Sequence, residues 1–308
     1  MGHDAASESL LAVAGIAAHD ETMTASTYQA DQALRRPFAN GDRTVRLWEA
    51  AQPHAVIVAI HGGMSHSGDY TTVGAYFRER AVTTISFDLT GHGQKARIDI
   101  PHFDVFLDDV ERMLAWTRAE YPGLPIFLMG HSMGALIATH LEIKGKLESL
   151  DVRGIILSSP YYANAIPVPA LVVRLSGVLA KLFPTAKVPM NSLTEWLTHD
   201  EAITHRHRED EQMHRRGTEA SMRFGRSLLD AQSALGGDLS RWQHPVFAVV
   251  AGDDKLADAN ISRQMLDTIP EQHRVLHYFP KNFHENFNET NRHEIFAALG
   301  QWMQKHLN

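Results

Sequence analysis

Short apolar runs alternate with segments of helical periodicity along most of the chain. An apolar run of about four to eight residues is typical of a strand that is buried on both faces of a parallel sheet. Strands are predicted over residues 55–60, 81–87, 126–129, 152–157, 246–251 and 275–279. Helices are predicted over residues 70–80, 103–121, from 135 onward, and over 291–307. This alternation predicts an α/β fold whose mostly parallel sheet is covered by helices on both faces.

The first part of the chain follows a different pattern. Residues 44–49 alternate between polar and apolar after Asn40-Gly41, which predicts a hairpin at an antiparallel edge of the sheet. Residues 1–33 are interpreted as an N-terminal extension. The apolar run at 10–18 is similar to the core of a signal peptide, but Asp4 and Glu8 stand where Lys or Arg is expected. We therefore expect a cytoplasmic protein.

Residues 160–240 lack the regular alternation and are interpreted as a helical cap, inserted into a core formed by residues 34–159 and 241–308. Residues 170–183 predict a helix that is apolar nearly all round, with Arg174 and Lys181 on one face. Packing on neighbouring segments is the favoured interpretation of this helix, and a transient contact with a membrane surface is compatible with it. Residues 205–216 are highly charged and predict a solvated face or loop.

The composition excludes several classes of function. With 29 Lys and Arg against 36 Asp and Glu, the formal net charge is −7, which argues against a nucleic-acid partner. The chain has no Cys, so thiolate catalysis and Cys-based zinc sites are excluded. Its 19 His lack His-Glu-x-x-His spacing, and we expect no metal site. No apolar run reaches the length of about 18 residues that indicates a transmembrane helix, so we expect a soluble protein, and its oligomeric state stays open.

A serine stands at the turn between a predicted strand and a predicted helix, in the sequence Gly-His-Ser-Met-Gly at 130–134. A nucleophile on such a tight turn needs neighbours without a Cβ, because strand and helix approach each other closely. Gly130 and Gly134 meet this need. The pattern alone is also compatible with a plain turn of small residues, but the buried strand before it and the helix after it favour a nucleophile at Ser132.

A serine nucleophile requires a base that takes its proton and a carboxylate that orients the base. Three carboxylates follow the predicted strand at 246–251, namely Asp253, Asp254 and Asp258. His284 follows the last predicted strand. The chain order of serine, aspartate and histidine, each after a strand, is that of α/β-hydrolases.

From about residue 40 to residue 307, the chain resembles the monoacylglycerol lipase and lysophospholipase branch of the α/β-hydrolase family. The resemblance rests on His-Gly-Gly-Met-Ser-His-Ser-Gly-Asp-Tyr at 61–70, Asp-Leu-Thr-Gly-His-Gly-Gln at 88–94, Gly-His-Ser-Met-Gly at 130–134, Gly-Asp-Asp-Lys-Leu-Ala-Asp at 252–258 and His-Glu-Asn-Phe-Asn-Glu at 284–289. It implies the α/β-hydrolase fold and hydrolysis of a carboxylic ester through an acyl-enzyme.

The resemblance also implies the roles of single residues. Ser132 corresponds to the nucleophile, His284 to the base and Asp254 to the acid, with Asp253 as the fallback. The backbone N–H groups of Gly63 and Met133 correspond to the oxyanion hole. No metal or organic cofactor is implied. The implied substrate is an ester with one fatty-acyl chain, such as a monoacylglycerol or a lysophospholipid.

The chain departs from this family at three places. Ser65 stands where the family often has Glu, and Asp69 stands where it has Arg. Residues 94–96 read Gln-Lys-Ala where the family has Gln-Ser. We expect these changes to leave the reaction intact and to alter the preference for the acyl chain or the head group.

Other functions are compatible with parts of the sequence. Residues 91–96 match the dinucleotide pattern Gly-x-Gly-x-x-Ala, but the residues after them do not open a helix, so the phosphate site is missing. A non-catalytic binding protein on the same fold is a second alternative, which the presence of all three triad residue types disfavours. A short-chain carboxylesterase, a thioesterase or a carbon–carbon bond hydrolase would use the same residues.

Overall fold

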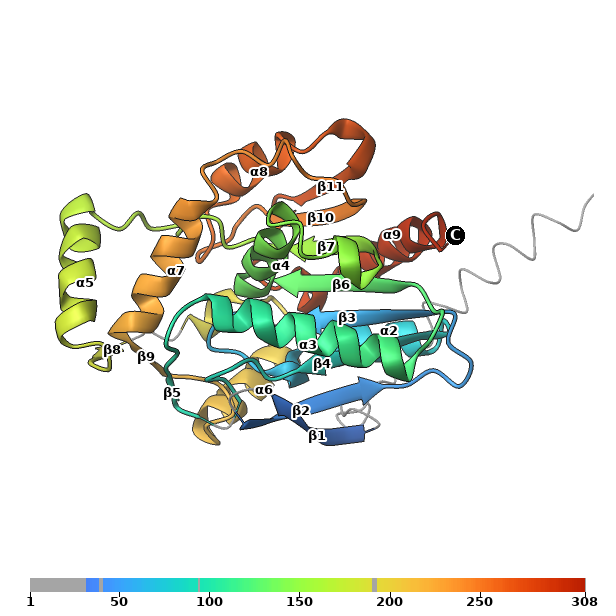
Figure 1. The fold of residues 1–308 in the computed structure, drawn as a ribbon, viewed down its shortest axis with the longest axis horizontal. Coiled ribbons are helices and arrows are strands. Elements are labelled where there is room, and N and C mark those ends of the chain that lie inside the picture. Colours follow the sequence, from blue (N-terminus) through green and yellow to red (C-terminus); the bar gives the residue numbers. More distant parts are fainter. Residues whose placement is uncertain (1–31, 39–40, 94, 190–192, 308) are drawn as a thin grey trace, which may run out of the picture.

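A central sheet of eight strands organises the structure (Figure 1). The structure is a computed structural model that describes residues 32–38, 41–93, 95–189 and 193–307. The strands are β1 (Gln32–Phe38), β2 (Gly41–Trp48), β3 (Ala55–Ile60), β4 (Val82–Phe87), β6 (Ile126–His131), β7 (Val152–Ser158), β10 (Val246–Ala251) and β11 (Arg274–Phe279). Their order is β1-β2-β4-β3-β6-β7-β10-β11. Residues 1–31 of the predicted N-terminal extension lie outside the described residues, and its last two residues begin β1.

The sheet is antiparallel only at one edge. Strand β2 pairs antiparallel with both β1 and β4, and β1 faces β2 with Phe38 opposite Gly41, as the predicted hairpin requires. All the other pairs, from β4 to β11, are parallel. Parallel strands place their carboxyl ends at one edge, so the loops that follow β3, β6, β10 and β11 meet there.

Helices cover both faces of the sheet, which confirms the predicted α/β fold. On one face lie α3 (Asp104–Glu120), α4 (Met133–Ile143) and α8 (Ala259–Asp267), and on the other lie α2 (Thr71–Arg78) and α9 (Arg292–Gln304). Strand β3 shows why its sequence is apolar throughout. Val56, Val58 and Ile60 pack on the first face, whereas Ala55, Ile57 and Ala59 pack on the second.

Between β7 and β10 the chain forms a separate group of elements, in the region predicted as the cap. They are α5 (Ala170–Leu182), β8 (Lys187–Pro189), η4 (Thr194–Trp196), α6 (Glu201–Gln212), β9 (Glu219–Ser221) and α7 (Met222–Ala234). Strand β9 pairs with β8 and also with β5 (Arg97–Ile98), which precedes α3. This small sheet joins the inserted region to the loop after β4. The boundaries of the cap, 160 and 240, stay predictions.

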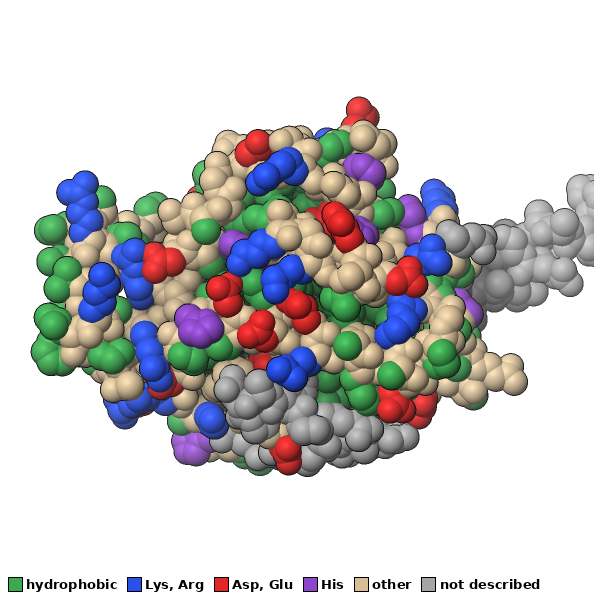
Figure 2. Space-filling model, in the orientation of Figure 1, with side chains coloured by type: hydrophobic (Ala, Val, Ile, Leu, Met, Phe, Trp, Pro, Cys, Tyr) green, Lys and Arg blue, Asp and Glu red, His purple; other side chains and the backbone are tan. Residues whose placement is uncertain are grey.

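Helix α5 lies at the edge of the molecule, beside α7 (Figure 1). It packs on α7 as predicted, but no residue of α5 is buried. Leu171 is 67% exposed and Leu182 is 65% exposed. Figure 2 shows hydrophobic side chains gathered on this edge, with Lys and Arg side chains beside them. The apolar surface of α5 therefore faces outward over most of its length.

The predicted solvated face at residues 205–216 is confirmed for side chains such as His205, Arg208 and Glu209, which are exposed, but it does not hold for the whole segment. Residues 201–212 form helix α6, and His207, Asp210 and Arg216 are buried. The side chain of His207 is 0% exposed. These groups can be buried because each has a partner in the core. His207 and Arg216 face carboxylates, whereas Asp210 accepts a hydrogen bond from His66.

In the described part of the chain, no helix is both long enough and apolar enough to cross a membrane.

Candidate active site

Ser132 stands alone between β6 and α4, at the turn predicted from the glycines. Its backbone has φ 54° and ψ −116°, a conformation that L-residues rarely adopt. A Cβ on Gly134 would collide with the carbonyl oxygen of Ile60, and a Cβ on Gly130 would collide with that of Gly134. The two glycines are therefore required by the close approach of β3, β6 and α4, which holds the Ser132 backbone in its strained conformation.

Asp254 and His284 lie on neighbouring loops, after β10 and β11. His284 Nδ1 donates a hydrogen bond of 2.6 Å to Asp254 Oδ2, and both side chains are buried. The other oxygen, Asp254 Oδ1, accepts from the N–H groups of Leu256 at 2.8 Å and Ala257 at 2.9 Å. Because Nδ1 carries the donated proton, Nε2 of a neutral His284 is the nitrogen that can accept one.

Electrostatics keep Asp254 ionised. Burial alone would raise the pKa of its carboxyl, but the electrostatic interaction with His284, the hydrogen bond from His284 and the two backbone N–H groups hold the pKa below its usual value. The neighbouring carboxylates have other contacts. Asp253 forms an exposed ion pair with Lys255, and Asp258 accepts from the N–H groups at the start of α8. Among the three candidates, Asp254 is the one that contacts His284.

Gly63 follows β3 and Met133 follows Ser132, and their backbone N–H groups are the predicted oxyanion hole. Both residues line the same cavity as Ser132 and His284. Neither N–H donates a hydrogen bond to another described residue. Two free N–H groups beside a serine are the donors that an oxyanion needs.

His61 supports the turn that carries Gly63, a role that sequence reasoning did not assign. Its Nδ1 donates to the carbonyl of Gly62 at 2.8 Å, and its Nε2 accepts from the N–H of Leu89 at 3.0 Å. Burial lowers the pKa of His61 to about 4, so the ring is neutral at pH 7. A neutral His61 thus links the turn after β3 to the loop after β4.

The cavity at this edge has a volume of about 260 Å³. Most of its wall is apolar and comes from the loop after β3 and from the inserted region. Its apolar side chains are Met64, Met133, Ile166, Val168, Leu193, Leu197, Phe224, Leu228 and Leu256. Its polar side chains, besides Ser132 and two histidines, are Ser65, Tyr161, Asn164, Arg216, Lys255 and Glu285. The cavity can therefore hold an apolar chain and a small polar group.

A buried ion-pair network lies beside the cavity and joins α6 and the residues just after it to the core. Arg216 pairs with Asp69 and contacts His207 Nδ1 at 3.0 Å. His207 Nε2 lies 2.8 Å from Glu285 Oε2. Burial would raise the pKa of Asp69, but the Arg216 guanidinium and the electrostatic interaction with His207 hold it well below its usual value. Two of the three places at which the chain departs from the family belong to this network, since Ser65 Oγ donates to Asp69.

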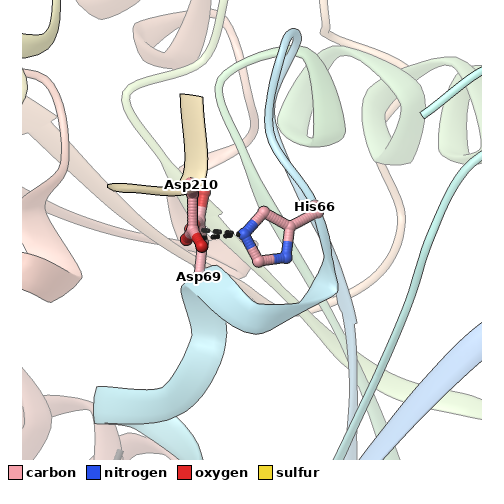
Figure 3. Close-up of side chains that lie close together, drawn as sticks. All are labelled: His66, Asp69 and Asp210. Carbon is pink, nitrogen blue, oxygen red and sulfur yellow. Dashed lines mark hydrogen bonds and ion pairs between the residues drawn. The ribbon is translucent and has the colours of Figure 1, made fainter. Parts of the chain in front are cut away.

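Figure 3 shows a second part of this network, in which His66 points toward Asp69 and Asp210. The ligand atoms of these three residues lie within 4.8 Å of one another, as in a metal site. However, His66 Nε2 already donates to Asp210 Oδ2 at 3.0 Å, and Asp69 already pairs with Arg216. The negative charges are thus compensated by side chains, and we assign no metal to this group.

Sequence reasoning missed this network. Its signals were the unusual Ser65 and Asp69 and the charged run at 205–216, but only the fold brings these segments together.

The chain is similar to known proteins over most of its length. Residues 51–291 match the family described as "Serine aminopeptidase, S33". The phospholipase YtpA of Bacillus subtilis is 30% identical, over 84% of this chain and 99% of that protein. The monoglyceride lipase of Homo sapiens is 27% identical, over 84% of this chain and 86% of that protein.

Among solved structures, a soluble variant of the monoglyceride lipase from Saccharomyces cerevisiae is similar in fold. Its TM-score is 0.78 at 20% identity, over 91% of this chain and 97% of that chain. The family match spans most of the sequence, and the Bacillus relative is covered almost completely. The chain therefore belongs to the serine aminopeptidase S33 family of α/β-hydrolases, in the branch of the monoglyceride lipases, and it is a serine ester hydrolase.

Proposed function

We propose that Ser132 is the nucleophile, His284 the general base and Asp254 the residue that orients and stabilises His284. The observation that carries this proposal is the hydrogen bond of 2.6 Å from His284 Nδ1 to Asp254, in the wall of a cavity that also contains Ser132. In this arrangement Nε2 takes the proton of the serine hydroxyl.

The reaction has two steps. Ser132 Oγ attacks the ester carbonyl carbon, its proton moves to His284 Nε2, and the N–H groups of Gly63 and Met133 stabilise the oxyanion. The bond to the alcohol oxygen then breaks, and His284 gives the proton to the leaving alcohol. In the second step a water molecule, deprotonated by His284, attacks the acyl-enzyme and releases the carboxylic acid and free Ser132.

The proposed substrate is an ester with one fatty-acyl chain, such as a monoacylglycerol or a lysophospholipid. The apolar wall of the cavity and the names of the relatives, which are monoglyceride lipases and a phospholipase, support this class. Each buried methylene group contributes about 0.8 kcal/mol, so the cavity favours long chains over acetyl or butyryl chains. A short-chain carboxylesterase or a thioesterase is the alternative.

A transient contact with a membrane surface through α5 completes the proposal. The exposed apolar side chains of α5 and the cations Arg174 and Lys181 support it, because such a surface binds the interface of an anionic bilayer. A cytoplasmic location remains a prediction.

A fluorophosphonate probe tests the proposed nucleophile. The probe is expected to label the wild-type protein at Ser132 and to leave the folded Ser132→Ala variant unlabelled. Labelling at another residue, or no labelling of the folded wild type, would contradict the proposal.

A further inference from the structure

Arg216 and Glu285 both line the cavity, and each carries a polar side-chain atom without a hydrogen bond to another described residue. Arg216 Nη2 lies 3.6 Å from Glu285 Oε1, which is longer than a hydrogen bond. No other described residue hydrogen-bonds either atom. Both residues are buried in the protein and line the cavity beside His284. Together they offer one N–H donor and one carboxylate acceptor to a group that enters the cavity.

The remaining atoms of both side chains are held by the network. Arg216 Nη1 contacts Asp69 and His207, whereas Glu285 Oε2 accepts from His207 Nε2 at 2.8 Å and from Asn288 Nδ2 at 2.7 Å. These contacts fix the position of the free donor and the free acceptor. A fixed pair loses little conformational entropy when it binds a ligand.

The other polar side chains of the cavity wall have partners. Tyr161 donates to Asn164, and Lys255 pairs with Asp253 at the surface. Ser65 donates to Asp69. Arg216 Nη2 and Glu285 Oε1 are thus two polar atoms of buried residues in the cavity wall that can each still form a hydrogen bond.

The place of this pair fixes which part of the substrate it meets. Glu285 follows His284 directly, and His284 must give its proton to the oxygen of the leaving alcohol. The alcohol part of the ester therefore lies next to His284 and within reach of Glu285. The apolar side chains from the inserted region, such as Ile166, Val168 and Leu228, remain for the acyl chain.

We propose that Arg216 and Glu285 bind a free hydroxyl group of the alcohol part of the substrate. This inference rests on the proposed function. The hydroxyl oxygen accepts from Arg216 Nη2, and its hydrogen is donated to Glu285 Oε1. One hydroxyl satisfies both groups, whereas an alkyl group satisfies neither and leaves two buried polar atoms without partners. The enzyme therefore selects esters of polyols, such as a monoacylglycerol, over esters of simple alcohols.

The same pair disfavours an anionic head group. Arg216 stands between two carboxylates, Asp69 and Glu285, so these three side chains together carry one net negative charge. Burial would raise the pKa of Glu285, but His207 and Arg216 hold it well below its usual value, so the carboxylate is ionised at pH 7. The oxygens of an ionised phosphate group accept hydrogen bonds and are repelled by Glu285. A lysophospholipid is thus expected to be a poorer substrate than the matched monoacylglycerol.

The test compares esters with one acyl chain and different alcohol parts by kcat/KM. The wild-type enzyme is given 1-lauroylglycerol, its derivative with both hydroxyls methylated, and 1-lauroylglycerol 3-phosphate. The hydroxyl ester is expected to be cleaved faster than each of the others by at least about tenfold, the effect of one hydrogen bond to a charged group. Equal rates for the free and the methylated ester would overturn the inference, and so would a preference for the phosphate.

The variant Glu285→Gln adds a second readout. It is expected to reduce the ratio of the rates for the hydroxyl and the methylated ester, whereas a purely structural defect lowers both rates alike. Glu289→Gln is the matched control, because Glu289 is a buried carboxylate of the same loop that contacts His199 rather than the cavity, and this variant is expected to keep the ratio. An unchanged ratio in an active Glu285→Gln enzyme would also overturn the inference. If the wild type cleaves none of the esters and Ser132 is not labelled, the proposed function itself fails.

Discussion

Helices α5 and α6 belong to the same inserted region, and each holds some side chains in surroundings that its sequence does not predict. Helix α5 is apolar nearly all round, yet no residue of it is buried. Helix α6 has eight charged or histidine side chains among its twelve residues, yet His207 and Asp210 are buried. The difference lies in what each helix faces. Helix α5 contacts α7 along one side, whereas α6 lies over the loops that carry Asp69 and Glu285.

This comparison shows that burial depends on the partner surface as much as on composition. A buried charge is tolerated when opposite charges and hydrogen bonds replace its water, and the α6 network provides both. An exposed apolar face costs little in the folded state, because the same groups are also exposed in the unfolded chain. We therefore expect α6 to contribute to stability and α5 to contribute mainly to interactions with other molecules.

The largest expected effect concerns two adjacent carboxylates, of which one is buried and the other is exposed. Asp254 is buried against His284, whereas Asp253 is exposed beside Lys255. Asp254→Ala is expected to lower the acylation rate by about 10⁴-fold, because His284 loses the group that fixes its tautomer and stabilises its charge. Asp253→Ala is expected to keep most of the activity. Single-turnover kinetics with a chromogenic ester measures both. The opposite result would move the acid to Asp253.

The next effect concerns two arginines near the same helix. Arg216→Met leaves Asp69 and Glu285 buried without their main cation, which is expected to lower the free energy of unfolding by about 3–5 kcal/mol. Arg208→Met is the control, because Arg208 forms an exposed pair with Glu195, and no measurable change is expected. Urea unfolding at pH 7 measures both variants. Equal free energies of unfolding for the two variants would show that the buried network makes no net contribution to stability.

Histidines of the core make the stability of the folded protein depend on pH. Burial lowers the pKa of His61 and His131 to about 4 and that of His92 to about 3, from the ordinary value of 6.5. Between these values the unfolded chain binds more protons than the folded protein, so the free energy of unfolding must fall as pH drops below 6.5.

Replacement of His92 tests one part of this fall in the free energy of unfolding. His92→Gln is expected to reduce the difference in unfolding free energy between pH 7 and pH 5 by about 1–2 kcal/mol. His205→Gln, at a side chain that is 71% exposed, should leave the difference unchanged. Urea unfolding curves at pH 7 and pH 5 measure this difference for each variant. The same difference in the His92 variant as in the wild type would show that His92 is not buried in its neutral form.

The core of the fold could be predicted because each of its signals is local. The strand at 55–60 is apolar throughout since both its faces are covered, and the glycines around Ser132 reflect contacts within a few residues or with the adjacent strand. The network around Arg216 could not be predicted in this way. Arg216 and Asp69 are 147 positions apart, and their pairing depends on how the inserted region lies on the core. Among Asp253, Asp254 and Asp258, the sequence alone left the choice open, and the family resemblance indicated Asp254.

The smallest expected effect concerns the apolar surface of α5. Leu175→Asp combined with Leu179→Asp changes two side chains that are 51% and 40% exposed, so the free energy of unfolding should change by less than about 1 kcal/mol. Turnover of a long-chain monoacylglycerol in anionic vesicles is expected to fall several-fold, because the charged face no longer enters the bilayer interface, while turnover of a soluble butyryl ester stays the same. Met213→Asp, at an exposed apolar side chain outside α5, is the control and should affect neither substrate. Equal losses on both substrates would mean that α5 supports the fold of the inserted region and does not contact lipid.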